Sequence, residues 1–294
     1  MNILIVGAKG QLGRDVMEVF GLSHTVHGLD LPECDASDPR AIGPEADAFG
    51  PEILVNCAAY TRVDAAETDH EEALRLNTTL PSVLAEVARK HGALLVQVST
   101  DYVFPGDRPP PEPYREEDAT GPATWYGHTK LEGERAVLRL APKAVVARTA
   151  WLYGSQGANF PRTILRLALK DSGRPLRVVD DQHGCPTWSR RLAEQLLKLA
   201  EADSRGVYHT VSEGHATWYE FAKLFLSAAG IDREMAPCMT RDFPTPAPRP
   251  RNSILLNARL HREGLGVFRS WEEDVRLFAT TYGAGWIEAL RRES

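Results

Sequence analysis

Short apolar runs alternate with amphipathic segments through the first 150 residues of the chain. The apolar runs are bounded by glycine, proline or acidic residues, a pattern typical of buried strands. Strands are therefore expected over 2–6, 25–29, 53–60, 94–99 and 143–149. Helices are expected over 15–20, from 39 onward, over 71–91 and from 122 through 140. Repeated strand–helix units predict an α/β fold, a doubly wound parallel sheet of the Rossmann type with helices on both faces.

The alternation becomes less regular after residue 150. Helices are expected over 159–170, 189–202, 218–229 and 271–282, with short strands over 176–180 and 206–210. A proline-rich, basic stretch covers 243–252. We expect residues 1–150 to form the first domain. Residues 151–294 are expected to form mainly a smaller substrate-binding domain, with some segments returning to the first sheet.

A glycine-rich turn joins the first expected strand to the first helix. The turn reads Gly7-Ala8-Lys9-Gly10-Gln11-Leu12-Gly13. Glycines let the backbone approach a pyrophosphate closely, and a helix N-terminus presents unpaired N–H groups to that anion. The sequence therefore predicts that residues 1–150 bind NAD(P), although a glycine turn without a ligand is the alternative.

Two features downstream of the turn fit the rest of a dinucleotide. Asp30 ends the second strand, where an acidic residue commonly binds the adenosine ribose and disfavours a 2′-phosphate. This favours NADH over NADPH, unless Asp30 is only a surface carboxylate. The small residues after the third strand leave room for a ligand, and Asp35 and Ala36 are placed to flank the adenine.

A tyrosine and a lysine lie four residues apart, at Tyr126 and Lys130. On a helix these side chains share one face, and a nearby cation lowers a phenol's pKa from about 10. The preceding strand ends in hydroxyl and carboxyl groups at Ser99, Thr100 and Asp101, where ligands of parallel sheets bind. The alternative is a partly exposed aromatic residue beside a solvated lysine.

Composition excludes several classes of function. The formal net charge of the 294-residue chain is −6, so no overall basic surface exists for nucleic acid or an anionic membrane. No apolar run reaches the roughly 20 residues of a membrane span. The four cysteines are far apart and lack zinc-site spacing, which favours a reducing, cytoplasmic setting.

Seven segments together resemble the dTDP-4-dehydrorhamnose reductase family of the extended short-chain dehydrogenase/reductase superfamily. The segments are 7–13, 56–64, 99–106, 126–134, 148–153, 181–187 and 249–253. They follow the family order over nearly the whole chain. The runs Ser-Thr-Asp-Tyr-Val-Phe at 99–104 and Asp-Gln-His-Gly-Cys-Pro-Thr at 181–187 are far more specific than Tyr-x-x-x-Lys.

The resemblance implies an activity and a set of residues. The family reduces the C4 ketone of dTDP-4-dehydro-6-deoxy-L-mannose to dTDP-L-rhamnose with NADPH or NADH. Tyr126 would be the general acid, Lys130 would hold the nicotinamide ribose and lower the pKa of Tyr126, and Thr100 would bind the carbonyl oxygen. The cofactor would contact Gly7, Gly10, Gln11, Leu12, Gly13, Asp30, Asp35, Ala36, Ala58, Ala59, Tyr60, Tyr126 and Lys130. The dTDP-sugar would contact Thr100, Asp101, Tyr102, Trp151, Arg249 and Arg251, unless the two arginines belong to a solvated loop.

One departure from the family concerns magnesium. Some members dimerise around a magnesium ion held by glutamates, one after the glycine turn and one after the Pro-Thr motif. Here Asp15 and the run Ser189-Arg190-Arg191 occupy these places, and an arginine's charge opposes a cation. We expect no metal site and no magnesium-mediated dimer, with monomer or homodimer left open.

Other functions remain as alternatives. The chain could reduce or epimerise another 4-keto nucleotide sugar. It could instead be a non-catalytic, cofactor-binding regulatory subunit resembling that of methionine adenosyltransferase. The complete set Thr100, Tyr126 and Lys130 favours catalysis.

Overall fold

A six-stranded parallel sheet forms the centre of the protein in a computed structural model that describes residues 1–170 and 173–292. Its strands are β1 (Asn2–Val6), β2 (Thr25–Leu29), β3 (Ile53–Asn56), β4 (Leu94–Thr100), β5 (Ala144–Thr149) and β10 (Gly206–His209). Their spatial order is β10-β5-β4-β3-β1-β2. From β1 the chain first adds β2 on one side and then crosses over to add β3 on the other side, so the strand order switches between β1 and β3. Ligands of such sheets bind at this switch point, beyond the carboxyl ends of the strands.

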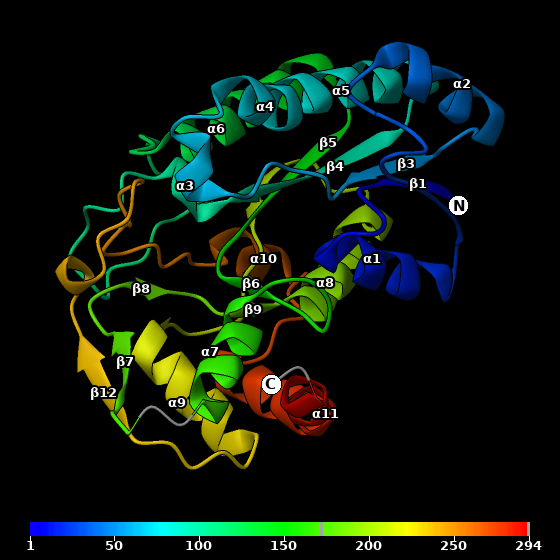
Figure 1. Cartoon of the computed structure of the whole chain (residues 1–294). Coiled ribbons are helices and arrows are strands. Elements are labelled where there is room, and N and C mark those ends of the chain that lie inside the picture. The colour runs from blue at the N-terminus through cyan, green and yellow to red at the C-terminus, as the bar shows by residue number, and fades with distance from the viewer. Residues whose placement is uncertain (171–172, 293–294) are drawn as a thin grey trace.

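Helices cover both faces of the sheet (Figure 1). One face carries α1 (Gln11–Gly21), α8 (Ser189–Glu201) and α10 (Ala258–Glu263), and the other carries α2 (Pro39–Phe49), α5 (Leu80–His91) and α6 (Trp125–Leu140). The short helices α3 (Val63–Ala66) and α4 (His70–Leu74) lie beside α6. Side chains of β1 alternate between the two cores, with Ile3 and Ile5 on one side and Leu4 and Val6 on the other. The predicted Rossmann-type α/β fold is confirmed.

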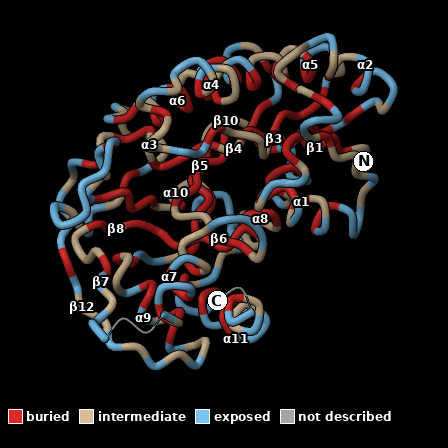
Figure 2. Tube along the Cα trace, in the orientation of Figure 1, coloured by how far each residue is buried: buried red, intermediate tan, exposed pale blue. Residues whose placement is uncertain are grey.

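A second core lies below the sheet in Figure 1. It is built by α7 (Phe160–Leu169), α9 (Trp218–Ala228) and α11 (Trp271–Arg292). Three two-stranded ladders accompany it: β6 (Leu152–Tyr153) with β9 (Thr187–Trp188), β7 (Leu176–Val179) with β12 (Met235–Cys238), and β8 (His183–Gly184) with β11 (Ala216–Thr217). Figure 2 shows the central strands buried and much of α11 exposed. Within the described residues, no helix is long and apolar enough to cross a membrane.

The expected helix over 71–91 is three elements rather than one. A π-helical turn, η1 (Arg75–Thr79), separates α4 from α5. Asn77 sits inside this wider turn and is buried. Its side chain accepts a hydrogen bond from Tyr60 N (3.0 Å) and donates to Tyr60 O and to Thr129 Oγ1 (3.1 Å each). The extra residue in the turn thus directs an amide toward the backbone of Tyr60 and the hydroxyl of Thr129.

Other element boundaries also differ from the expectation. The third strand ends at Asn56 instead of reaching residue 60, because the Asn56 side chain accepts a hydrogen bond from Ala58 N. Helix α6 begins after Thr124, whose hydroxyl caps Gly127 N at 3.0 Å. Helix α1 begins at Gln11, and α11 runs ten residues beyond the expected end, to Arg292. Strand β12, helix α10 and the 3₁₀ turns η2 (Asp101–Val103) and η3 (Thr240–Asp242) were not predicted.

Candidate active site

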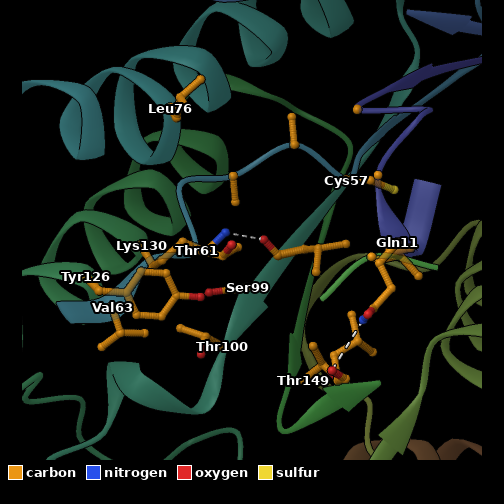
Figure 3. A pocket seen from close by; sticks show the side chains of 18 of the residues that line it. Gln11, Cys57, Thr61, Val63, Leu76, Ser99, Thr100, Tyr126, Lys130 and Thr149 are labelled. Atoms are coloured by element: carbon orange, nitrogen blue, oxygen red, sulfur yellow. Dashed lines mark hydrogen bonds between the residues drawn. The ribbon is translucent and has the colours of Figure 1, made fainter. Parts of the chain in front are cut away.

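A cavity of about 980 Å³ opens at the carboxyl ends of the central strands, between the sheet and the second core. It is lined by most of the residues that the sequence singled out. These are Gly7, Gly10, Gln11, Leu12, Asp30, Asp35, Ala36, Ala58, Ala59, Thr100, Asp101, Tyr102, Tyr126, Lys130, Trp151 and Arg249. Gly13, Tyr60 and Arg251 do not line it. Figure 3 shows the part of the cavity around Tyr126 and Gln11.

The glycine turn leaves the N-terminus of α1 open to this cavity. Gly7 has a φ of +78°, and a Cβ there would lie 2.6 Å from Ala58 N, so the turn packs directly on the end of β3. A Cβ on Gly13 would lie 2.0 Å from Gly7 O, so Gly13 supports the turn from behind. No side chain caps α1, and the first N–H groups of a helix lack intrahelical partners. The turn therefore fits a dinucleotide pyrophosphate.

Carboxylates are fixed at the neighbouring edge of the cavity. Asp30 accepts hydrogen bonds from Lys9 N (2.7 Å) and Leu31 N (2.8 Å). Asp35 is held by the Ser37 hydroxyl at 2.6 Å and by the Arg75 guanidinium, and these contacts lower its pKa. Hydrogen bonds thus orient both side chains where an adenosine would lie beyond the glycine turn.

The end of β4 supplies a hydroxyl and a carboxyl group to the cavity. Thr100 Oγ1 donates a hydrogen bond to Asp101 Oδ1 at 2.9 Å. Both residues are buried, and Ser99, just before them, has a buried hydroxyl without a partner within the described residues. Parallel pairing sets Thr100 beside Thr149 of β5. Hydroxyl donors therefore gather where the sheet meets the cavity.

Helix α6 places Tyr126 and Lys130 beside these hydroxyls. Figure 3 shows the Tyr126 ring directed toward Ser99 and Thr100, with Lys130 one turn further along the helix. Thr100 lies close enough to the Tyr126 phenol for its hydroxyl to lower the pKa of that phenol. Lys130 Nζ donates to Val98 O at 2.7 Å, which leaves two of its N–H groups for a ligand. The structure therefore brings together the three groups proposed for catalysis.

The electrostatic expectation for this pair was wrong. Lys130 was expected to lower the pKa of Tyr126, but burial raises the pKa of Tyr126 to about 12, and the hydrogen bond from Thr100 only partly opposes this. Burial also lowers the pKa of Lys130 to about 8, with Glu134 opposing the shift. Desolvation is thus the largest cause at both groups, and it keeps the phenol protonated.

Trp151 forms the opposite wall of the cavity. It stacks on Trp218 with ring centroids 3.5 Å apart, and Trp218 Nε1 donates to Gln182 Oε1 at 3.1 Å. A Cβ on Gly184 would lie 2.3 Å from the Trp151 ring, so this glycine makes room for the stack. The stack offers a broad apolar face with a fixed orientation.

The two candidate diphosphate ligands are separated. Arg249 lines the cavity, and its Nη2 donates to Asp64 Oδ2 at 2.7 Å. Arg251 is exposed on the outer surface, near His183 and His215. Tyr60 lies behind the cavity wall, where its ring packs with Tyr126. The roles of these three residues stay predictions.

The residues at the two positions where some family members bind magnesium make hydrogen bonds to other residues of this chain. Asp15 accepts a hydrogen bond from the Ser189 hydroxyl, and Arg190 pairs with Glu18 at 2.6 Å. Burial raises the pKa of Asp15. Among the described residues, no cluster of three histidine, cysteine or acidic groups is arranged to hold a metal.

Several cavity residues were not predicted. Trp218 and Gln182 come from the second core and reach the cavity only through tertiary packing. Lys9, within the glycine turn, also lines the cavity, and its Nζ pairs with Glu33 at 2.6 Å. No local pattern marks Trp218, whereas Gln182 belongs to the run at 181–187 and Lys9 places a charge inside the glycine turn.

Comparison with known proteins places the chain in a family. Residues 1–283 match the family described as RmlD substrate binding domain. The chain is 40% identical to a dTDP-4-dehydrorhamnose reductase of Streptomyces griseus, covering 91% of this chain and 90% of the relative. It is also 40% identical to a protein of Streptomyces antibioticus named a probable dTDP-4,6-dihydroxy-2-methyloxan-3-one 4-ketoreductase, over 94% of each chain.

A solved structure agrees with this placement. The dTDP-4-dehydrorhamnose reductase of Bacillus anthracis, crystallised in complex with NADP, is 35% identical and superimposes with a TM-score of 0.89, covering 94% of this chain and 98% of the other. The resemblance inferred from the seven sequence segments is therefore confirmed. The chain belongs to the RmlD family, together with the dTDP-4-dehydrorhamnose reductases that it resembles.

Proposed function

We propose that the protein reduces the C4 ketone of dTDP-4-dehydrorhamnose to give dTDP-L-rhamnose, using NADPH or NADH. The observation that carries the proposal is the meeting of the Tyr126 phenol, the Thr100 hydroxyl and the glycine turn in one cavity. The names of the similar reductases support the same reaction.

The reduced nicotinamide dinucleotide supplies the hydride. As the ketone gains that hydride, negative charge develops on its oxygen, and Tyr126 donates a proton to it. The Thr100 hydroxyl, which donates to Asp101 in this structure, lies beside the phenol and would turn to donate a second hydrogen bond to the ketone oxygen. A phenol whose pKa burial raises to about 12 stays protonated at neutral pH and is ready to act as the acid.

Lys130 orients the cofactor rather than lowering the pKa of Tyr126. Its Nζ is fixed by Val98 O, and its remaining N–H groups face a cavity that also contains the glycine turn. We infer that these donors hold the hydroxyls of the cofactor ribose. Its pKa of about 8 means that the ammonium form predominates at neutral pH and is lost above that value.

The far end of the substrate would lie against the second core. The stacked Trp151 and Trp218 rings offer a flat face for a sugar or a thymine base. Arg249 presents a guanidinium that is paired with only one carboxylate, Asp64, among the described residues. We assign it to the diphosphate, for which a guanidinium fork is suited. Four free cysteines fit a reducing compartment, and we infer a cytoplasmic location.

A second candidate is the reduction of a different 4-keto sugar linked to dTDP. It is favoured by the relative from Streptomyces antibioticus, which is named for another dTDP-linked ketone and is as similar as the rhamnose-pathway relative from Streptomyces griseus. The catalytic groups act on the ketone alone, so they serve either sugar.

The test is consumption of NADPH or NADH by the purified protein, followed by the absorbance of the reduced nicotinamide. The substrates are dTDP-4-dehydrorhamnose and dTDP-4-keto-6-deoxyglucose, with chromatographic identification of the product. The proposal expects dTDP-L-rhamnose from the first substrate at the higher kcat/KM. Preference for the second substrate would favour the second candidate, and no oxidation with either would overturn both.

A further inference from the structure

A second hollow, of about 360 Å³, lies on the outer side of the wall that bounds the active-site cavity, and we call it the outer hollow. Its lining residues are Pro110, Pro111, His183, His215 and Arg251, and none of the described residues lines both this hollow and the cavity. The immediate neighbours Gln182 and Pro250 line the cavity instead. Side chains alternate between the two sides of an extended chain, so residues 182–184 and 249–252 present one side to the cavity and the other to the outer hollow.

Hydrogen bonds hold the segments around the outer hollow together. His183 N donates to Arg251 O at 2.9 Å. Asn252 Nδ2 donates to Glu112 O at 2.7 Å, which ties the same segment to the proline-rich loop. Strand β8 also pairs with β11, which begins directly after His215. The hollow therefore exists before any ligand binds, and a ligand would need to order little of the chain.

Three side chains that carry or accept a positive charge meet in the outer hollow. The His183 and His215 ring centroids are 6.4 Å apart, and Arg251 completes the set. Within residues 1–170 and 173–292, no ion pair or side-chain hydrogen bond includes any of the three. Burial lowers the pKa of His183, and the neighbouring His215 and Arg251 lower it further, against the effect of Glu220 and Asp180.

The two carboxylates near His183 have other partners. Glu220 accepts a hydrogen bond from Thr217 N at 2.8 Å, as part of the cap of α9. Asp180 accepts one from the Thr217 hydroxyl at 2.6 Å. The positive charge of the outer hollow is therefore left without an acidic side chain in contact with it.

This arrangement fits an anion better than a metal ion. A guanidinium presents planar N–H donors that match phosphate oxygens, and a protonated imidazole adds a charged donor. An anion between the three groups would relieve their mutual repulsion, whereas the charge of Arg251 would oppose a cation held by the two imidazoles. Pro110 and Pro111 have no N–H groups and provide an apolar face beside the anion, where the carbon part of a ligand can pack.

We propose that the outer hollow is a binding site for a phosphate-type dianion, held by Arg251, His183 and His215. The inference does not depend on the reductase reaction. It gives Arg251 a ligand other than the dTDP-sugar diphosphate that the sequence resemblance implied. The dianion is either inorganic phosphate or the phosphate group of a monoester, and the two differ in whether carbon atoms contact the two prolines.

The test uses sulfate, a dianion whose charge stays constant between about pH 5 and 8, where histidine titrates. Histidine ring resonances of the full-length protein are followed by NMR at constant ionic strength. Saturation with sulfate should raise the pKa of His183 by about one unit, because a neighbouring anion favours the charged imidazole. The resonance of His261, which pairs with Glu213 outside the hollow, should not move. Sulfate affinity should fall as pH rises, since the charged imidazoles are lost.

Variants at exposed positions connect the effect to the hollow. Arg251→Gln should weaken sulfate binding by about tenfold, on the scale of a lost hydrogen bond to a charged group, and His215→Gln should weaken it as well. The matched control Arg262→Gln removes the same charge from an exposed position outside the hollow and should change the affinity by less than about twofold. Circular dichroism melts check that each variant remains folded.

Inorganic phosphate and glycerol 3-phosphate, titrated at one pH, identify the ligand. Tighter binding of glycerol 3-phosphate supports a monoester whose carbon atoms contact the prolines, and equal affinity supports free phosphate. Binding of neither, or a His183 response to about 50 mM sulfate no larger than that of His261, would overturn the proposal. An Arg251→Gln protein that binds dTDP more weakly but sulfate normally would also overturn it, because Arg251 would then serve the dTDP-sugar.

Discussion

Replacing Arg148 with methionine should destabilise the protein strongly, because Arg148 and Glu134 form an ion pair next to the active site. The guanidinium donates to both carboxylate oxygens, and the two shortest hydrogen bonds are Nη2–Oε2 at 2.8 Å and Nε–Oε1 at 3.0 Å. The two side chains are 5% and 2% exposed. The pair joins β5 to α6, and Glu134 lies one turn beyond Lys130.

The size of the stability loss follows from the burial of Glu134. Arg148→Met fills a similar volume but leaves Glu134 as an unpaired carboxylate in the interior. Breaking a buried pair in this way costs about 3–5 kcal/mol in the free energy of unfolding. At about 2.1 cal/mol/K per residue, the 294-residue chain has an unfolding entropy of about 0.6 kcal/mol/K, so this cost corresponds to a fall in melting temperature of roughly 5 to 8 °C.

The assay is thermal and urea unfolding followed by circular dichroism. The control is Arg135→Met, on α6 beside Glu134. It breaks an exposed ion pair with Glu132 and should lower the free energy of unfolding by less than about 1 kcal/mol. The double variant Glu134→Gln with Arg148→Met should regain part of the loss, because it removes the unpaired charge. A cost for Arg148→Met no larger than that for Arg135→Met would refute the reasoning.

Three further predictions concern the cavity. Gly13→Ala should lower NADPH affinity by about tenfold or more in a fluorescence titration, because its Cβ would lie 2.0 Å from a carbonyl oxygen of the glycine turn, whereas Gly43→Ala, with open space around it, should have no effect. Because burial lowers the pKa of Lys130 to about 8, the ammonium and its donors are lost as pH rises through that value, so NADPH affinity should fall on the alkaline side, and an affinity that is flat to pH 10 would contradict this. Asp64→Asn should free Arg249 from its ion pair and tighten binding of dTDP in calorimetry by about twofold to fivefold, and weaker binding would show that Asp64 holds Arg249 in place for the ligand.

Local sequence patterns predicted the elements whose causes are local. The run from Asn2 to Val6 and the glycine turn needed only their own residues to indicate a strand, a tight turn and a helix. The spacing of Tyr126 and Lys130 likewise placed both on one face of α6. Because these patterns depend on neighbours in the chain, they can be read without the structure.

Features caused by distant residues could not be predicted in this way. The π-helical turn exists because Asn77 serves the backbone of Tyr60 and the hydroxyl of Thr129. The pKa of Tyr126 is raised by burial, and burial depends on the whole fold rather than on the lysine one turn away. Trp218 reaches the cavity only through its stack on Trp151. In each case the cause lies in packing between segments far apart in the sequence.

The central claim is that Tyr126 protonates the C4 oxygen of a nucleotide-linked ketone. The most direct measurement compares wild type and Tyr126→Phe for reduction of dTDP-4-dehydrorhamnose, with NADPH affinity measured in parallel by fluorescence. Loss of a general acid should lower kcat by about a hundredfold or more, while the affinity for NADPH changes by less than about threefold. Unchanged turnover in Tyr126→Phe would contradict the account.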